Sequence, residues 1–229
     1  MILIIGAMDE EVSALSEISR NPQSFVFEDI EVTVADMGSE KIMIAKSGIG
    51  KATAAYTASI LCSHFRPSVL INIGSAGGLQ EGQQTGDVVL SASCRFHDLD
   101  IGPDTPTDER FLFIPSEKYV VLAEEILNQL EIRYHKGLIV TGDQFLTKDL
   151  PAYLRVKKHF SQAICAEMEA AAIASVCSRN KTPFIVLRGI SDLIFTEGNE
   201  VDFMKYLEKA SKTSAQICKA FVERINELG

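Results

Sequence analysis

Apolar runs alternate with helix-like stretches along the whole chain. The runs predict strands at residues 1–5, 25–34, 41–46, 68–73, 87–91, 136–141 and 183–190. The stretches between them predict helices at residues 9–19, 50–64, 117–130, 148–160 and 169–179. Apolar residues at steps of three and four, from Phe203 to Ile225, predict a long final helix.

This order of elements predicts an α/β protein. Strands that are apolar on both faces and separated by helices are typical of a central sheet covered on both sides. No linker, internal repeat or low-complexity tract divides the chain, so one domain over residues 1–229 is expected. Residues 98–112 form the clearest predicted loop, because they combine prolines, a glycine and several charges without periodicity.

Composition and charge narrow the class of protein. Of 229 residues, 46% are apolar and 23% are charged, which excludes disorder as the main state. The 22 basic and 31 acidic residues give a net charge of −9, which argues against binding nucleic acid or an anionic membrane. The apolar runs are too short to span a membrane, and the N-terminus lacks the basic segment of a secretory signal.

The cysteines and histidines do not form a metal-binding pattern. The five cysteines include no Cys-x-x-Cys pair, and none lies near a histidine at ligand spacing. We therefore expect free thiols in a reducing cytoplasm and no metal site.

Ligands of such sheets bind beyond the carboxyl ends of strands. Four segments occupy that position, at residues 7–11, 74–78, 141–146 and 188–192. The first contains Asp9, Glu10 and Glu11, which would stabilise a helix N-terminus without any other role. Three acids exceed what capping requires, so one of them is a candidate base.

The other segments are equally open on local evidence. The glycines at 74–78 could form a tight turn or let a ligand approach the backbone, and they match neither a P-loop nor Gly-x-Gly-x-x-Gly. Glu167 and Glu169 lie among alanines, so they are expected to be held rather than solvated. Arg188 lies in an apolar strand and needs a partner, whether structural or functional. Phe145 could be a core residue or a stacking platform for a flat ring.

Taken together, these segments resemble the bacterial 5′-methylthioadenosine/S-adenosylhomocysteine nucleosidases of the purine nucleoside phosphorylase-like superfamily. The matching motifs occur in the family's order and cover nearly the whole chain, at residues 5–11, 47–51, 74–78, 96–98, 141–145, 166–170 and 188–192. The resemblance implies a three-layer α/β/α domain with a central mixed, twisted sheet of the nucleoside phosphorylase type.

The resemblance also implies an activity and its partners. The family hydrolyses the bond between adenine and ribose in 5′-methylthioadenosine and S-adenosylhomocysteine, without a metal or organic cofactor. 5′-Deoxyadenosine and 6-amino-6-deoxyfutalosine are further expected substrates. The expected assembly is a homodimer in which the partner subunit contributes to the pocket for the 5′ substituent.

Roles for individual residues follow from the same resemblance. Asp192 matches the acid that protonates N7 of adenine, with Ser191 as its orienting neighbour, and a raised pKa would let it keep that proton near pH 7. Glu11 matches the carboxylate that activates water. The other residues that the resemblance places in the catalytic or binding site are Arg188, Glu169, Glu167, Met168, Ser75, Phe145, Leu146, Ala7, Met8, Ile49 and Phe203.

Within that set, Glu169 is expected to bind the ribose hydroxyls, with Met168 packed against the sugar and Glu167 assisting. Phe145 is expected to stack on adenine while the backbone of Leu146 contacts the edge of the base. Ala7, Met8 and Ile49 correspond to apolar walls near the 5′-thio group, which suits a thioether.

One segment departs from the family pattern. Residues 101–111 are rich in proline and acids, where relatives have a longer loop with glycines and aromatic residues. The change bears on the outer wall of the pocket for the 5′ substituent. Two other functions stay open from the sequence: a phosphate-dependent nucleoside phosphorylase and a non-catalytic nucleoside-binding protein. A carboxylate at Glu11 disfavours the first, because it would repel phosphate.

Overall fold

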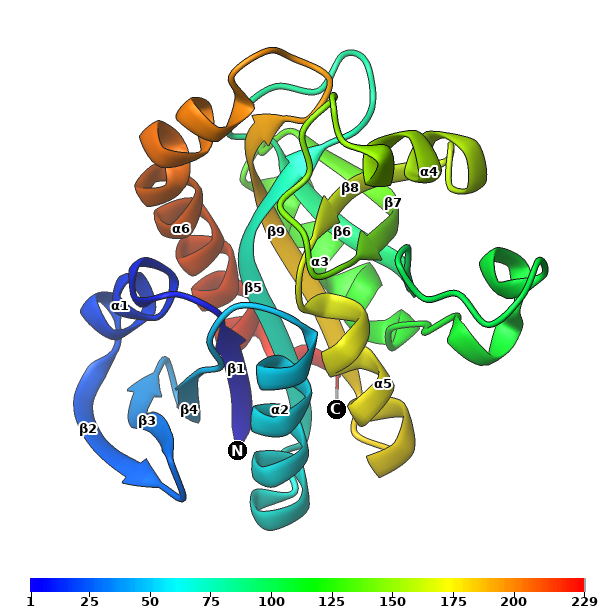
Figure 1. Cartoon of the computed structure of the whole chain (residues 1–229). Coiled ribbons are helices and arrows are strands. Elements are labelled where there is room, and N and C mark those ends of the chain that lie inside the picture. The colour runs from blue at the N-terminus through cyan, green and yellow to red at the C-terminus, as the bar shows by residue number, and fades with distance from the viewer. Residues whose placement is uncertain (229) are drawn as a thin grey trace.

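A mixed sheet of nine strands runs through the molecule (Figure 1). The computed structural model describes residues 1–228. The strand order across the sheet is β2-β3-β4-β1-β5-β8-β7-β6-β9. The strands are β1 (Ile2–Gly6), β2 (Arg20–Phe27), β3 (Ile30–Met37), β4 (Glu40–Lys46), β5 (Val69–Gly78), β6 (Val88–Phe96), β7 (Tyr134–Thr141), β8 (Ala163–Glu167) and β9 (Phe184–Leu193).

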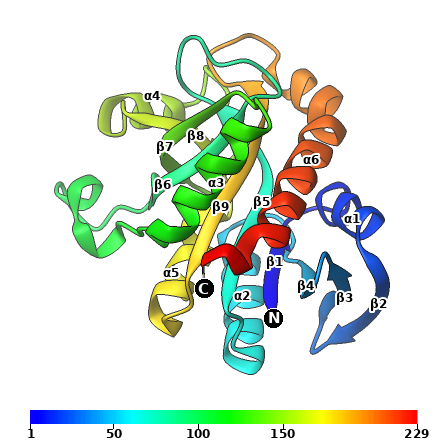
Figure 2. The same ribbon diagram turned by 180° about the vertical axis from the view of Figure 1, so that it is seen from behind.

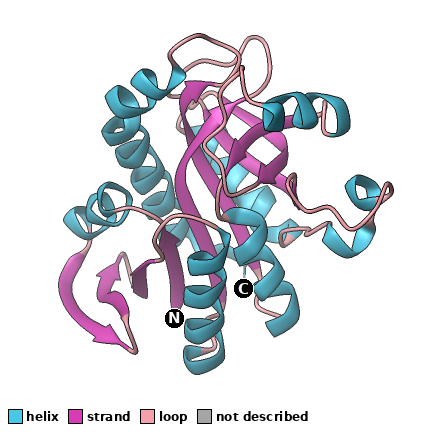
Figure 3. Ribbon diagram, in the orientation of Figure 1, coloured by secondary structure: helices cyan, strands magenta, loops and turns pink. Residues whose placement is uncertain are grey.

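Helices cover both faces of the sheet, as Figure 3 shows by colour. They are α1 (Asp9–Ile18), α2 (Lys51–Phe65), α3 (Glu117–Gln129), α4 (Pro151–His159), α5 (Ala170–Asn180) and α6 (Asn199–Arg224). α1, α3 and α6 pack against one face, and α2 and α5 against the other. Figure 2 shows the face that carries α3 and α6. The predicted three-layer α/β/α fold is confirmed.

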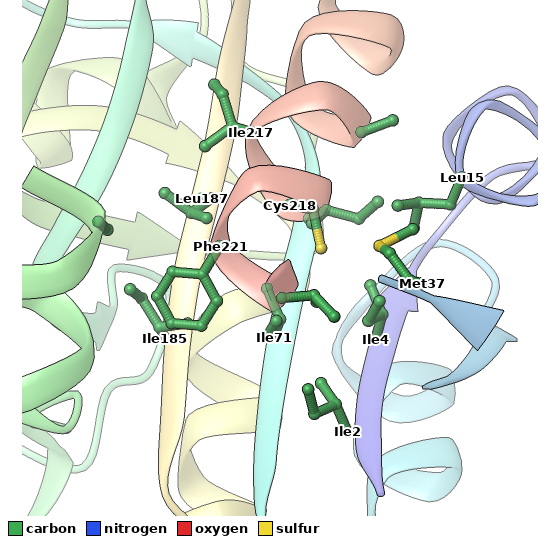
Figure 4. Packing of buried hydrophobic residues seen from close by; sticks show 14 of the residues in the cluster. Ile2, Ile4, Leu15, Met37, Ile71, Ile185, Leu187, Ile217, Cys218 and Phe221 are labelled. Carbon is green, nitrogen blue, oxygen red and sulfur yellow. The ribbon is translucent and has the colours of Figure 1, made fainter. Parts of the chain in front are cut away.

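The central strands are apolar on both faces because each face packs under a helical layer. In β1, Ile2 and Ile4 belong to the cluster beneath α6, whereas Leu3 and Ile5 belong to the cluster beneath α2 and α5. β9 alternates in the same way. Figure 4 shows the first cluster, in which Phe221 of α6 lies over β9 near Ile185 and Leu187. The alternation explains why these strands appear in the sequence as continuous apolar runs.

Three parallel strands form the centre of the sheet, with β5 between β1 and β9. β9 also pairs antiparallel with β6, so β5, β8, β7, β6 and β9 close into a ring. In the β5–β9 ladder, Gly74 lies opposite Arg188 and Gly77 opposite Asp192. β1, near the start of the chain, and β9, near its end, therefore lie on either side of β5.

Two sequence-based strand predictions were wrong or incomplete. Residues 25–34 are not one strand, because a turn with Glu28 at φ 55° divides β2 from β3. β2 is exposed along nearly its whole length, so it carries no buried–exposed alternation that would reveal it. β8 was not predicted, since its five residues include two alanines and lie directly before a helix.

Two strands run further than the predicted ranges, 68–73 and 183–190. β5 continues through the glycines to Gly78, and β9 continues past Asp192 to Leu193. Gly74 has φ 149°, and a Cβ atom there would lie 2.4 Å from Nη1 of Arg188 and 2.7 Å from Oε1 of Glu11. The glycine is thus required because two charged side chains pass close to the backbone.

The described part of the chain holds no helix with the length and apolar character that a membrane span requires. The five cysteines are all buried and free.

Candidate active site

One cavity of about 340 Å³ opens where β1, β5, β8 and β9 end. The segments that were expected to hold the site converge on it. The cavity is lined by Ala7, Met8, Glu11, Ile49, Ser75, Ala76, Gly77, Phe145, Ala166, Glu167, Met168, Glu169, Arg188, Ser191, Asp192 and Phe203. Of the sequence-predicted site residues, only Leu146 lies outside this lining, and it borders a smaller cavity beside it.

Glu11 is fixed at the start of α1 with its carboxylate turned into the site. Its Oε2 accepts from the backbone N–H of Ala7 at 2.7 Å and of Met8 at 3.2 Å. Its Oε1 accepts from the backbone N–H of Ser75 at 3.0 Å. Burial raises the pKa of Glu11, and the Arg188 charge and these N–H groups oppose the rise. The carboxylate is therefore rigid, dry and close to Ser75.

The two neighbouring acids have a different role. Asp9 and Glu10 are exposed, and Asp9 pairs with Lys46 at 2.9 Å. Of the three acids at this helix start, Glu11 alone enters the cavity.

A single guanidinium ties two carboxylates together. Nη2 of Arg188 lies 2.5 Å from Oε2 of Glu167 and 3.3 Å from Oε2 of Glu169. It also donates to Oδ1 of Asn72 at 2.8 Å, and Nη1 donates to the carbonyl of Ser75 at 3.2 Å. The carboxylates of Glu167 and Glu169 raise the pKa of Arg188 against the lowering effect of burial, so the arginine is charged. We call Glu11, Glu167, Glu169 and Arg188 the Arg188 cluster.

Both carboxylate oxygens of Glu167 accept hydrogen bonds from the protein. Its Oε2 accepts from the backbone N–H of Glu169 at 2.9 Å and of Ala170 at 2.8 Å, at the start of α5. Its Oε1 accepts from the hydroxyl of Thr141. These bonds, with the Arg188 pair, make Glu167 an anchor between β7, β9 and α5.

Glu169 has fewer hydrogen bonds to the protein than Glu167. Its Oε1 accepts from the backbone N–H of Gly50 at 2.9 Å, just before α2. Burial raises its pKa to about 7, with the negative charges of Glu167 and Glu11 adding to the rise and Arg188 opposing it. Two carboxylates thus pair with one guanidinium and Glu11 adds a third nearby, so the site carries a net negative charge when all three are ionised.

Asp192 is buried in β9 and is held by neutral groups. Its Oδ1 accepts from the hydroxyl of Ser191 at 2.8 Å, and its Oδ2 accepts from the side-chain amide of Asn199 at 2.7 Å. Burial raises the pKa of Asp192, and these two hydrogen bonds oppose the rise. We call Ser191, Asp192 and Asn199 the Asp192 cluster.

The outer part of the cavity is apolar and aromatic. Phe145 and Phe203 meet edge to face, with ring centroids 5.3 Å apart and planes at 69°. Phe145 is 37% exposed and lines the cavity, where an aromatic ring can stack on a flat ligand. Met8, Ile49 and Met168 line the same cavity.

Three residues that hold the site together were missed by sequence reasoning. Asn72 interrupts an apolar strand, and a polar residue in such a run is a signal that could have been used. Thr141 ends β7, where hydroxyls are common and carry little information. Asn199 follows an exposed Gly198 in a loop, and no spacing or periodicity marks it.

No group of three or more histidine, cysteine or acidic side chains is placed to hold a metal ion within residues 1–228.

Comparison with known proteins gives a consistent result. A sequence profile of the Phosphorylase superfamily matches residues 1–223. The 5′-methylthioadenosine/S-adenosylhomocysteine nucleosidase of Bacillus subtilis is 36% identical over 234 residues, which cover 98% of this chain and 99% of that protein.

Solved structures agree with that match over the whole fold. The S. pneumoniae nucleosidase of the same name, with the transition-state inhibitor MT-ImmA, has a TM-score of 0.90 and 33% identity, over 98% of this chain and 99% of that chain. The Colwellia psychrerythraea enzyme in complex with adenine has a TM-score of 0.89 and 34% identity, over 96% and 93%. These matches span the cavity and every strand that lines it, so the chain belongs to the 5′-methylthioadenosine/S-adenosylhomocysteine nucleosidases of the Phosphorylase superfamily.

Proposed function

We propose that this chain hydrolyses the N-glycosidic bond of 5′-methylthioadenosine and S-adenosylhomocysteine, releasing adenine. One observation carries the proposal. A single cavity holds an acid among neutral donors, Asp192, and a second carboxylate, Glu11, held beside a charged arginine. Hydrolysis needs these two environments, because one group must give a proton and another must attract one. The relatives named above support the same reaction.

In the proposed reaction, the bond between C1′ of ribose and N9 of adenine breaks and its electron pair goes to the base. The proton of Asp192 passes to N7, so adenine leaves as a neutral molecule. The oxygen of a water molecule bonds to C1′ and its proton passes to Glu11. Asp192 ends ionised and Glu11 ends protonated, and exchange with solvent restores both.

The Arg188 cluster supports this sequence electrostatically. Positive charge develops on the sugar as the bond breaks, and three buried carboxylates against one guanidinium favour that charge. Glu169 has an oxygen available for the ribose hydroxyls, since Oε1 accepts only from Gly50. Glu167 acts as an anchor in this proposal rather than as a direct contact of the sugar, because protein donors occupy its oxygens.

The remaining lining residues define where the substrate lies. The ring of Phe145 stacks on adenine, which places the base beside the backbone of Leu146 and the carboxyl of Asp192. Met168 and Ser75 line the sugar region. Ala7, Met8, Ile49 and Phe203 form an apolar region for the 5′-thio substituent. We also propose 5′-deoxyadenosine and 6-amino-6-deoxyfutalosine as further substrates. The second has a bulkier 5′ substituent, and residues 101–111, at the expected outer wall of that pocket, differ from the family pattern.

The charges in the cavity disfavour the phosphorylase alternative. Arg188 is the only basic side chain among the described residues that line it, and Glu167, Glu169 and Asn72 already occupy its Nη2. A phosphate dianion would enter a site with excess negative charge and no available cation.

We also propose a homodimer. A groove of about 750 Å³ between α2, α5 and the segment at 96–113 carries Phe96, Phe111 and Phe113. Ile101 in this segment and Ile114 next to it are each 60% exposed. We propose that a second copy covers this face, burying the exposed parts of these side chains, and that its own 101–113 segment contributes to the 5′ region. Light scattering at micromolar concentration should report twice the mass of 25.1 kDa, and a stable active monomer would contradict the proposal.

A reducing compartment such as the cytoplasm suits the five buried, free thiols. The same protein purified without reductant should titrate as five thiols after denaturation, and a native disulfide would argue against this location.

The activity is tested by chromatography of reactions with 5′-methylthioadenosine, S-adenosylhomocysteine, 5′-deoxyadenosine and 6-amino-6-deoxyfutalosine, each with and without phosphate. Adenine and free sugar should form at equal rates in both conditions. Cleavage that requires phosphate and yields a sugar 1-phosphate would show a phosphorylase instead. Nucleoside binding without cleavage would show a non-catalytic protein.

A further inference from the structure

Asn199 is a buried amide with an unusual set of partners. It is the first residue of α6 and is 1% exposed, although Glu197, Gly198 and Glu200 around it are exposed. Its Nδ2 donates to Oδ2 of Asp192 at 2.7 Å and to the carbonyl oxygen of Leu146 at 2.9 Å. Its own Oδ1 has no hydrogen-bond partner within residues 1–228.

The second hydrogen bond fixes which way the amide faces. The carbonyl of Leu146 can only accept, so turning the amide over would set one oxygen against another. Asn199 therefore always presents an N–H group to Asp192. Ser191 differs, because its hydroxyl lies 2.8 Å from Asp192 and 3.3 Å from the carbonyl of Ala76, and it can donate to either. Ser191 can also accept from a protonated carboxyl, which Asn199 cannot do.

From this geometry we infer that Asn199 is a positioning residue for the acid, holding Asp192 against the adenine-binding backbone of Leu146 and stabilising the negative charge that Asp192 gains when its proton passes to the base. The inference rests on the proposed nucleosidase activity and on Asp192 as the acid. Asn199 touches no reacting atom and acts through Asp192 alone.

The fixed direction of the hydrogen bond from Asn199 to Asp192 supports a functional role. The N–H of Asn199 is already in place before charge develops, so no reorganisation is needed when the proton leaves. The hydrogen bond from Asn199 is also the largest influence that opposes the raised pKa of Asp192.

The test is the Asn199→Leu variant, which keeps the branched shape of the side chain and removes the donor. We expect kcat for 5′-methylthioadenosine to fall about 10- to 100-fold, the range for a hydrogen bond to a charged group, with a smaller change in KM. The basic limb of the kcat–pH profile should move to higher pH, because Asp192 loses its proton less readily without this N–H. A loosened loop would lower the rate without moving the limb in that direction.

Asn199→Ala is a second variant that removes the donor without adding a larger apolar group, so it remains informative if the leucine variant does not fold. The basic limb should again move to higher pH. Thr196→Val is the matched control. Thr196 is in the same loop and its hydroxyl donates to the carbonyl of Leu193 at 2.8 Å, without touching Asp192. Its profile should match that of the wild-type protein.

The outcomes separate this inference from the proposed function. Wild-type protein that releases no adenine, or an Asp192→Asn variant that keeps its activity, would remove the proposed function or its acid. Active wild-type protein with Asn199 variants whose basic limb stays in place or moves to lower pH would overturn the role of Asn199 alone. An equal loss of rate in Thr196→Val would do the same.

Discussion

The Arg188 cluster and the Asp192 cluster lie at one cavity, but their carboxyl groups have different kinds of partner. In the first, carboxylates share a guanidinium and collect backbone N–H groups. In the second, one carboxyl has only a hydroxyl and an amide for partners. Burial raises the pKa of Glu11, Glu169 and Asp192 alike. The difference is the charge of the neighbouring group. The Arg188 guanidinium favours the ionised form of the carboxylates beside it, whereas Asp192 has only neutral hydrogen-bond donors and can keep its proton.

The largest expected effect tests the role of Asp192 as the acid. Asp192→Asn keeps the shape but cannot give a proton, so kcat should fall by about 10⁴-fold, the upper range for general acid catalysis. Binding of 5′-methylthioadenosine, followed by calorimetry, should survive. A variant that keeps most of its turnover would show that another group protonates adenine.

On the side of the Arg188 cluster, Glu11→Gln should lower kcat by about 10²- to 10³-fold, because the amide cannot take the proton of water. Glu10→Gln is a matched control, since this neighbouring acid is exposed and should leave the rate unchanged. Equal rates for Glu11→Gln and the wild type would assign water activation to another residue.

Glu167 sharpens the contrast between anchoring and catalysis. Glu167→Gln removes one charge of a buried pair and should reduce the free energy of unfolding by about 3 kcal/mol, which lowers the melting temperature by roughly 6–12 °C. Glu31→Gln, which loses an exposed ion pair with Lys46, should cost about 1 kcal/mol or less. Similar melting temperatures for the two variants would mean that the Arg188–Glu167 pair adds no stability.

The last expected effect is a dependence of stability on pH. The pKa of Glu169 is about 7 in the folded protein, above its ordinary value of 4.5. Between these values the folded state binds more protons than the unfolded state, so stability should fall as pH rises from about 4.5 to 7. Thermal melting across this range should show the slope, and Glu169→Gln should reduce it. An identical slope in the variant would assign the dependence to other groups.

The residues that line the cavity were predicted better than the residues that hold them in place. Glu11, Glu169, Arg188 and Asp192 were candidates because they are charged residues beside apolar strands whose ends converge. The choice of Glu11 over its two neighbouring acids, and the role of each residue, came from the resemblance to the family. Asn199 was not found, since its role depends on a hydrogen bond to Leu146, which lies 53 residues away in the chain.

The sheet was predicted where its strands are apolar on both faces and missed where a strand is exposed or short. β1 and β9 are apolar on both faces, so their sequences are distinctive. β2 is exposed and β8 is short, and neither has a periodic pattern. The closure of five strands into a ring depends on β9 pairing with both β5 and β6, and such long-range pairing leaves no local mark in the sequence.

The parallel ladder of β1, β5 and β9 has a consequence for how the protein is made. Glu11 follows the first strand, whereas Asp192 lies in the last strand and Asn199 begins the last helix. A ribosome must therefore release nearly the whole chain before the acid and the base can meet. A nascent or truncated chain that ends before β9 has Glu11 but lacks both Arg188 and Asp192, so it should be inactive.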